Sequence, residues 1–215
     1  DPSQQYQRQL NEQSMTLEVC DLKDGDARAA TKNVGMDMLR YKNLEMFVHG
    51  EEVDPTKPLN NYDVTVFVRL GTDFKENYYE YEIPVKKTPW GAKSDLAIWP
   101  EENNVRVVFE ELIALKKERN RAMESPGTGA AYNVEYTKVV DHQPGKSDNN
   151  NVNHPKRMIK VKGNPNLADV KTIMIGIRNP AQNGDNPWKP DDGFAKCVEV
   201  WVNELRLTEF DNKGR

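Results

Sequence analysis

Apolar side chains recur at every second position in four separate segments of this sequence, and this pattern restricts the possible folds more than any other feature. Successive side chains of a β-strand point to opposite faces, so each segment would present one apolar face to a core. The pattern therefore predicts strands spread along the chain. The four segments are Val64–Leu70, Tyr79–Val85, Ile173–Arg178 and Val198–Asn203.

Shorter segments of similar character bring the expected number to roughly eight to ten strands. Strands joined by turns, with little helix, favour a mainly β fold, and specifically an antiparallel β-sandwich of the jelly-roll type. No polar segment separates two self-sufficient sets of strands, so we expect a single domain over residues 1–215. The shorter segments are Met15–Val19, Leu44–His49, Tyr132–Val139 and Met158–Val161.

One long helix is expected near residues 107–123. Val108, Leu112 and Leu115 recur there at helical spacing, and Pro and Gly follow the end of the segment. The C-terminal half carries a basic cluster, which favours a solvated helix end over a nucleic-acid contact because Glu is interspersed and the whole chain is acidic. The cluster comprises Lys116, Lys117, Arg119 and Arg121.

Two polar segments without periodicity, near residues 141–157 and 179–196, are predicted to be mobile surface loops. The second segment carries Trp188. A tryptophan in a long polar loop either folds back as a lid on the core or is displayed to a partner. We favour the lid, because an exposed tryptophan is rare without a purpose.

Composition excludes several classes of protein. The formal net charge of −4 and the sequence pI near 5.5 provide no basic field to attract nucleic acid. With a mean hydropathy of −0.84, the chain has no apolar run near the roughly 20 residues of a membrane helix, so we expect a water-soluble piece that does not itself insert into a membrane. The chain begins with Asp1 and Pro2, without a starting Met or a signal region, which indicates a segment of something longer.

The two cysteines leave two states open. Cys20 and Cys197 lie near opposite ends of the chain and lack the CxxC spacing of a zinc site. They either form a disulfide bond in an oxidising compartment or remain two buried thiols. A jelly roll often places its first and last strands side by side, which would bring the two cysteines together.

No segment shows the spacing of a catalytic centre, so we expect a non-enzymatic domain with no catalytic residues, no cofactor and no metal site. His49 ends an apolar strand, and His142 and His154 lie in a polar loop without a GxSxG or HExxH motif. The loop Asp21–Asp26 is the best candidate for a calcium site, but an ordinary turn around Gly25 is favoured.

The outer faces of the predicted strands suggest one ligand and one ion pair. A hairpin across Gly71–Asn77 would place Arg69 close to Glu80, as an ordinary cross-strand pair worth roughly 0.2–1 kcal/mol. Tyr78 shares its strand face with Glu80 and Glu82, which predicts an exposed aromatic ring. An exposed aromatic on a sandwich face is typical of carbohydrate-binding modules, and this is our alternative interpretation.

Several stretches closely resemble the SprA/Sov family of Bacteroidetes. The sequences GTDFKENYYEYEIP (71–84) and WVNELRLTEF (201–210) are distinctive. The resemblance extends over nearly the whole chain in the same order. It covers residues 11–30, 41–52, 66–85, 112–120, 161–179 and 198–214.

The resemblance implies a gliding-motility and type nine secretion protein, which serves as an outer-membrane protein-export channel. The present chain would be a soluble accessory or interaction domain of that channel. Its expected partners are other parts of the channel, secreted cargo or secretion-system subunits. The resemblance supplies no catalytic or binding residues to carry over. Because outer-membrane proteins of this kind have long outer loops and short periplasmic turns, we expect the domain at the cell surface, with the periplasmic side as the alternative.

Overall fold

The computed structural model describes residues 14–140, 155–182, 184, 187–188 and 191–210. In the part of the chain that it describes, ten strands, two α-helices and three short 3-10 helices follow one another. In chain order they are β1 (Met15–Leu22), β2 (Ala27–Met36), η1 (Met38–Arg40), β3 (Tyr41–Glu52), β4 (Thr65–Gly71), β5 (Tyr78–Pro84), α1 (Asp95–Ile98), η2 (Glu101–Asn103), β6 (Val105–Val108), α2 (Phe109–Met123), β7 (Tyr136–Val140), β8 (Arg157–Lys162), η3 (Leu167–Asp169), β9 (Val170–Arg178) and β10 (Lys196–Phe210).

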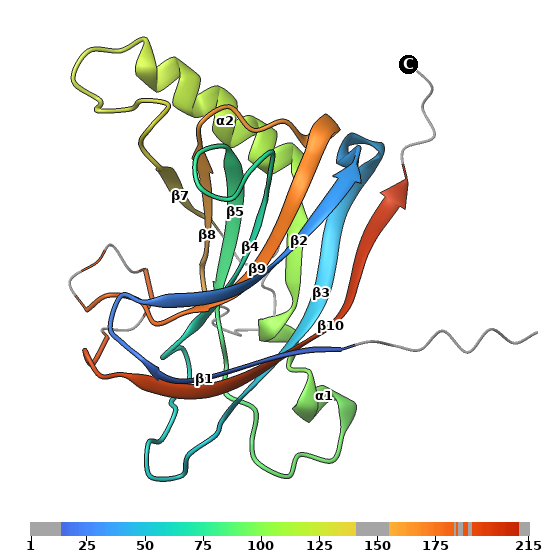
Figure 1. Cartoon of the computed structure of the whole chain (residues 1–215), viewed down its shortest axis with the longest axis vertical. Helices are drawn as coiled ribbons and strands as arrows, with labels where there is room; N and C mark the ends of the chain where they lie inside the picture. Colours follow the sequence, from blue (N-terminus) through green and yellow to red (C-terminus); the bar gives the residue numbers. More distant parts are fainter. Residues whose placement is uncertain (1–13, 141–154, 183, 185–186, 189–190, 211–215) are drawn as a thin grey trace, which may run out of the picture.

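The strands form two antiparallel sheets that pack against each other (Figure 1). One sheet has four strands in the order β1-β10-β3-β6, and the other has six in the order β2-β9-β4-β5-β8-β7. Among the described residues α2 is the only long helix, and it lies across one end of the sandwich, against β8 and β3. The predicted mainly β, antiparallel sandwich with one long helix is therefore confirmed.

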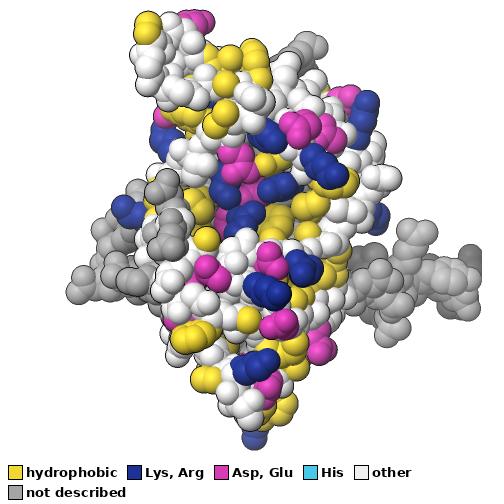
Figure 2. Space-filling model, turned by 60° about the vertical axis from the view of Figure 1, so that its left-hand side comes forward, with side chains coloured by type: hydrophobic (Ala, Val, Ile, Leu, Met, Phe, Trp, Pro, Cys, Tyr) yellow, Lys and Arg dark blue, Asp and Glu magenta, His cyan; other side chains and the backbone are white. Residues whose placement is uncertain are grey.

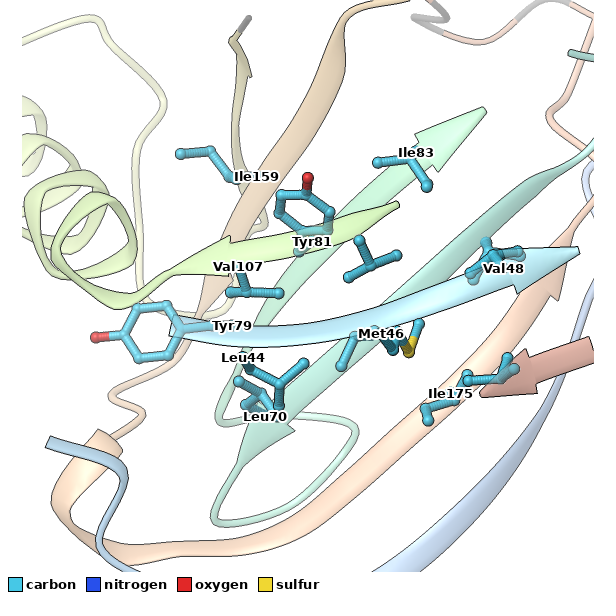
Figure 3. Close-up of a cluster of buried hydrophobic side chains, with 14 of the residues drawn as sticks. Leu44, Met46, Val48, Leu70, Tyr79, Tyr81, Ile83, Val107, Ile159 and Ile175 are labelled. Atoms are coloured by element: carbon cyan, nitrogen blue, oxygen red, sulfur yellow. The ribbon is translucent and has the colours of Figure 1, made fainter. Parts of the chain in front are cut away.

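The two-residue pattern places the core between the sheets. Val66 in β4 pairs with Ile83 in β5 and Ile177 in β9, so these three side chains share the inner face, and none of them is exposed to solvent. Met46 and Val48 of β3 face them from the four-stranded sheet (Figure 3). Burying each side chain of this size contributes about 1.5–3 kcal/mol.

The long helix starts later than the predicted range 107–123. It spans Phe109–Met123, and the residues before it form strand β6, Val105–Val108. Val107 pairs with Leu44 of β3 and is buried. The helical spacing and the strand alternation overlap at these valines, and pairing with β3 decides in favour of the strand.

The first and last described strands are neighbours, as a jelly roll would require. Val19 of β1 pairs with Val198 of β10, and Cys20 forms a disulfide bond with Cys197. The structure thus selects the bonded state that the sequence left open. The bond joins residues separated by 177 positions.

The hairpin between β4 and β5 is closed by an acidic cap. The carboxylate of Asp73 accepts the backbone N–H groups of Lys75 (2.9 Å), Glu76 (2.6 Å) and Asn77 (3.1 Å), and also the side-chain amide of Asn77 (2.8 Å). Burial raises the pKa of Asp73, but these hydrogen bonds outweigh burial and lower the pKa to about 2.

We expect Asp73→Asn to lower the free energy of unfolding at pH 7 by about 1–2 kcal/mol, because a charged acceptor of several backbone N–H groups is lost. A carboxyl with a lowered pKa stabilises the fold above its unfolded pKa, and this contribution disappears as the pH falls through about 2. Urea unfolding of wild type and variant should therefore differ at pH 7 and converge near that pH. Asp169→Asn, in an exposed ion pair with Lys171 (3.4 Å), is the control and should change stability by less than about 0.5 kcal/mol.

Asp21 and Leu22 end strand β1, and the rest of the predicted loop Asp21–Asp26 forms a turn around Gly25, as favoured. The backbone N–H of Asp26 donates to the Lys23 carbonyl oxygen (2.9 Å), and Gly25 has a φ of 77°, which suits glycine. Within the described ranges, no cluster of three or more His, Cys, Asp or Glu side chains is arranged to hold a metal ion.

The two predicted mobile loops are only partly described. Residues 141–154 lie outside the described residues, so mobility there stays a prediction. At the start of the second loop, 179–196, the Asn179 side-chain amide donates to the carbonyl oxygens of Leu22 (3.0 Å) and Phe194 (2.9 Å), which fixes this end of the loop.

No helix within the described ranges has the length and apolar character needed to cross a membrane.

Candidate functional site

Charged side chains gather in the middle of the outer face of the six-stranded sheet (Figure 2). Four adjacent strands supply them. Arg69 of β4 lies directly opposite Glu80 of β5, and Glu80 lies opposite Lys160 of β8. Glu82 follows two positions after Glu80 on the same face, and Arg178 ends β9. We call these five residues the charge network.

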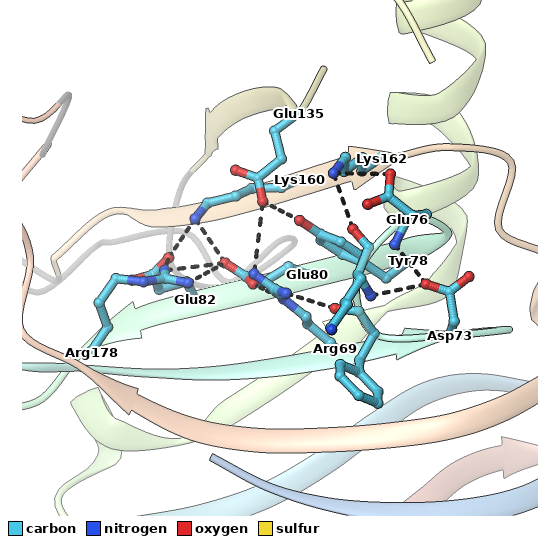
Figure 4. A network of polar contacts seen from close by, with 12 residues as sticks. Arg69, Asp73, Glu76, Tyr78, Glu80, Glu82, Glu135, Lys160, Lys162 and Arg178 are labelled. Atoms are coloured by element: carbon cyan, nitrogen blue, oxygen red, sulfur yellow. Dashed lines mark hydrogen bonds and ion pairs between the residues drawn. The ribbon is translucent and has the colours of Figure 1, made fainter. Parts of the chain in front are cut away.

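Two carboxylates at the base of the charge network are fully buried and are held by three cations (Figure 4). The Lys160 ammonium lies 2.7 Å from Glu80 Oε1 and 2.9 Å from Glu82 Oε2. Arg178 contacts both carboxylates, at 3.1 Å from Glu80 Oε1, and Arg69 pairs with Glu80. The Thr65 hydroxyl also donates to Glu82 Oε1 at 2.6 Å. Each buried carboxylate therefore has several hydrogen-bond partners.

The ion pairs outweigh the cost of burial in the charge network. Burial raises the pKa of Glu80, but the charges of Lys160, Arg178 and Arg69 hold it below its ordinary value of 4.5. Burial lowers the pKa values of Lys160 and Arg178, but Glu82 and Glu80 raise both above their ordinary values. Glu80, Lys160 and Arg178 therefore stay ionised at neutral pH.

The stability that Glu80 contributes should depend on pH in a defined direction. Because its folded pKa is lowered, the contribution is complete above about pH 4.5, the unfolded value, and is lost as the pH falls below it. We expect wild type to lose at least about 1 kcal/mol more than Glu80→Gln in free energy of unfolding between pH 5 and pH 3. Urea denaturation of both proteins across this range measures the difference. Parallel pH profiles would contradict the prediction.

The prediction that Tyr78 is exposed is wrong. Only 3% of Tyr78 is exposed, its hydroxyl donates to the Glu135 carboxylate, and the Arg69 guanidinium lies 4.0 Å from its ring centre. Burial and the Glu135 carboxylate raise the pKa of Tyr78. Arg69 from the neighbouring strand β4 covers the ring, so Tyr78, on which the carbohydrate-binding alternative rested, is not available to a sugar.

A sugar-binding face around Tyr78 would also need Trp90 or Trp99 beside it, and both lie elsewhere. Trp99 packs against Phe47 and His49 on the other sheet, with ring centres 6.4 and 6.0 Å apart. Trp90 is 82% exposed in the loop before α1. Neither tryptophan therefore supports a sugar-binding face around Tyr78.

Trp188 folds back, as favoured, but over the charge network instead of the apolar core. It is half-buried, and its indole N–H donates to the Lys156 carbonyl oxygen at 2.5 Å. It lines a hollow of about 340 Å³ together with Met158 and Pro180 and the charged groups Arg69, Glu82, Glu135, Lys160 and Arg178.

The basic cluster of α2 is less solvated than predicted. Arg119 is fully buried, its guanidinium carbon lies 4.8 Å from the Tyr132 ring centre, and its Nε donates to Asn120 (2.9 Å). The Lys116 ammonium donates to the Pro165 carbonyl oxygen at 2.8 Å. The segment after the helix folds back over its end, which the local charge pattern did not indicate.

The sequence predicted one ion pair of the charge network, between Arg69 and Glu80, but as an ordinary cross-strand pair on the outer face. Lys160 and Arg178 were missed, and Glu82 was placed on this face without a partner. The available signal was that charged residues alternate with apolar ones on adjacent strands, which places opposite charges on one outer face.

His49, at the end of an apolar strand segment, has a structural role. Its Nδ1 lies 3.0 Å from the Ile98 carbonyl oxygen, and its ring stacks on Trp201 with the ring centres 4.5 Å apart.

The charge network is suited to rigid ionic contact, because its buried carboxylates fix cations that line an open hollow.

A comparison with protein families identifies the family of the chain. A family model described as a motility related/secretion protein, the SprA N-terminal family, matches residues 1–215, the whole chain.

The chain belongs to the SprA N-terminal family. The resemblance in the sequence is therefore confirmed at the level of the family, and the chain is a motility- and secretion-related protein. Among curated proteins, the comparison found no match. A secretion-related SprA family points to association with the cell envelope and to interaction with other secretion components.

Proposed function

We propose that this SprA N-terminal segment is a non-enzymatic accessory domain of an outer-membrane protein-export channel, acting in type nine secretion and gliding motility of Bacteroidetes. It contacts other parts of the same channel, secreted cargo or secretion-system subunits. The observation that carries the proposal is the family match over residues 1–215.

Two features of the structure support this role. The disulfide bond between Cys20 and Cys197 is of a kind that persists in oxidising compartments outside the cytoplasm. The charge network joins four strands through fully buried carboxylates, which suits a domain that keeps one shape while partners bind and leave. In some proteins, buried polar or ionic groups are retained because they favour one structure over its alternatives.

The export role is tested in the full-length protein in its host cell. Deleting residues 14–210 should reduce the amount of secreted cargo in the medium, or the amount of assembled channel in the envelope. Immunoblotting of the envelope fraction separates these two outcomes. The control is the full-length protein carrying Lys138→Met, a change in an exposed ion pair. Normal secretion of every cargo by the deletion strain would refute the proposal.

We further propose that the domain faces the cell surface. Protease added to intact cells should then cleave within residues 14–210 of the full-length protein, while a periplasmic protein used as an internal standard stays intact. Cleavage only after the outer membrane is permeabilised would place the domain on the periplasmic side.

A further inference from the structure

A groove of about 480 Å³ lies on the outer face of the four-stranded sheet. Phe47 of β3 and Trp99, just after α1, form its aromatic wall, with ring centres 6.4 Å apart. Leu96 of α1 adds an apolar side chain that is 81% exposed. These surfaces are suited to the aliphatic stem of a long side chain.

The polar part of the groove is acidic. Asp95, Glu101 and Glu204 supply three carboxylates, and the described residues that line the groove include no lysine or arginine. Asn104 also lines it, and its side-chain oxygen is buried without a hydrogen-bond partner in the described structure. Carboxylates and an unpaired buried acceptor both favour a ligand that carries N–H donors and positive charge.

A second acidic centre lies on the same sheet face. The strand register places Glu18, Glu199 and Glu51 side by side on β1, β10 and β3. Within the chain, Glu199 accepts the Trp201 indole N–H at 2.5 Å, and Glu51 lies 3.4 Å from His49 Nε2. Like charges directly opposite each other still repel, and a cation from outside the chain would reduce that repulsion. Along β3, Glu51 follows Phe47 by four residues, which corresponds to about 13 Å of extended chain.

The chain itself shows how a guanidinium fits at this surface. Arg206 lies with its guanidinium carbon 5.4 Å from the Phe47 ring centre and pairs with Glu204 at 2.8 Å. This combination of an aromatic face and a carboxylate is the usual environment of a bound cation.

We propose that this groove binds a lysine or arginine side chain of an extended partner segment, and that a second basic residue four positions away pairs with the Glu18–Glu199–Glu51 row. The stem lies against Trp99 and Leu96, and the charged head lies among the carboxylates and donates to Asn104. This inference rests on the proposed function as an interaction domain and specifies the chemistry of the partner.

The test is fluorescence anisotropy with the 215-residue chain and a short fluorescein-labelled peptide of serine and leucine that carries two lysines four positions apart. The wild-type chain should bind this peptide, bind it more weakly as salt rises, and not bind the counterpart with glutamate in place of lysine. The double variant Asp95→Asn/Glu204→Gln should weaken binding about fivefold or more. Leu96→Ser should also weaken it.

Matched controls locate the effect. Glu110→Gln/Glu124→Gln removes two exposed carboxylates of the α2 region, and Trp90→Ser removes a side chain as exposed as Leu96 (82% and 81%) that does not line this groove. Both should bind the lysine peptide like wild type. Equal binding of the two peptides, or equal effects of groove and control variants, would overturn the inference. Loss of export on deletion, together with such a result, would leave the proposed function standing.

Discussion

Replacing Lys160 with methionine should lower the free energy of unfolding by about 3–5 kcal/mol, because it leaves two fully buried carboxylates with one cation fewer. The Lys160 ammonium contacts both Glu80 and Glu82, and its side chain is only 9% exposed. Methionine keeps the length and the apolar stem, so the change isolates the charge. Urea denaturation of the 215-residue chain at pH 7 measures the effect.

The neighbouring strand offers a matched control. Lys138 of β7 pairs with Glu118 at 2.6 Å, but the two side chains are 47% and 44% exposed. Exposed ion pairs contribute little, so Lys138→Met should cost less than about 1 kcal/mol. Similar losses for the two methionine variants would show that burial of the charge network does not govern its contribution.

Breaking the disulfide bond should produce a comparably large loss. Cys20→Ser/Cys197→Ala removes a bond that closes a loop with a separation of 177 residues, and the chain-entropy account gives a stabilisation of about 5 kcal/mol for so long a loop. Thermal and urea unfolding of the oxidised wild type and the double variant measure the difference.

Reduction provides the control for this variant. Wild type treated with a thiol reductant should approach the stability of Cys20→Ser/Cys197→Ala, and the reductant should leave the double variant unchanged. A double variant as stable as the oxidised wild type would contradict the prediction.

The strands that the sequence predicted are those with one clearly apolar face. β4 and β9 alternate strictly because their inner side chains face the core, and these were identified. β2 (Ala27–Met36) was missed because it is an edge strand and none of its residues is fully buried. Two of its residues that share a face with core positions of β9 are charged, Arg28 and Lys32. Such inward charges protect an edge from pairing with another chain, and they erase the apolar rhythm.

The candidate site was less predictable than the fold because it depends on how different strands cover one another. A local pattern assigns Tyr78, Glu80 and Glu82 to the outer face correctly, but it equates the outer face with exposure. Arg69 and Lys160 reach across from neighbouring strands and bury all three. Their positions follow from the strand order, which the sequence alone did not establish.

The link between Cys20 and Cys197 also determines how this domain would respond to mechanical tension. A pull applied to strands β1 and β10 would pass through the covalent bond, so the residues between the two cysteines would carry none of it. Fully extended, these residues would span about 600 Å, and none of this length would be released until the bond is reduced. A domain of a motility and secretion protein built in this way would act under strain as a short, nearly inextensible tie.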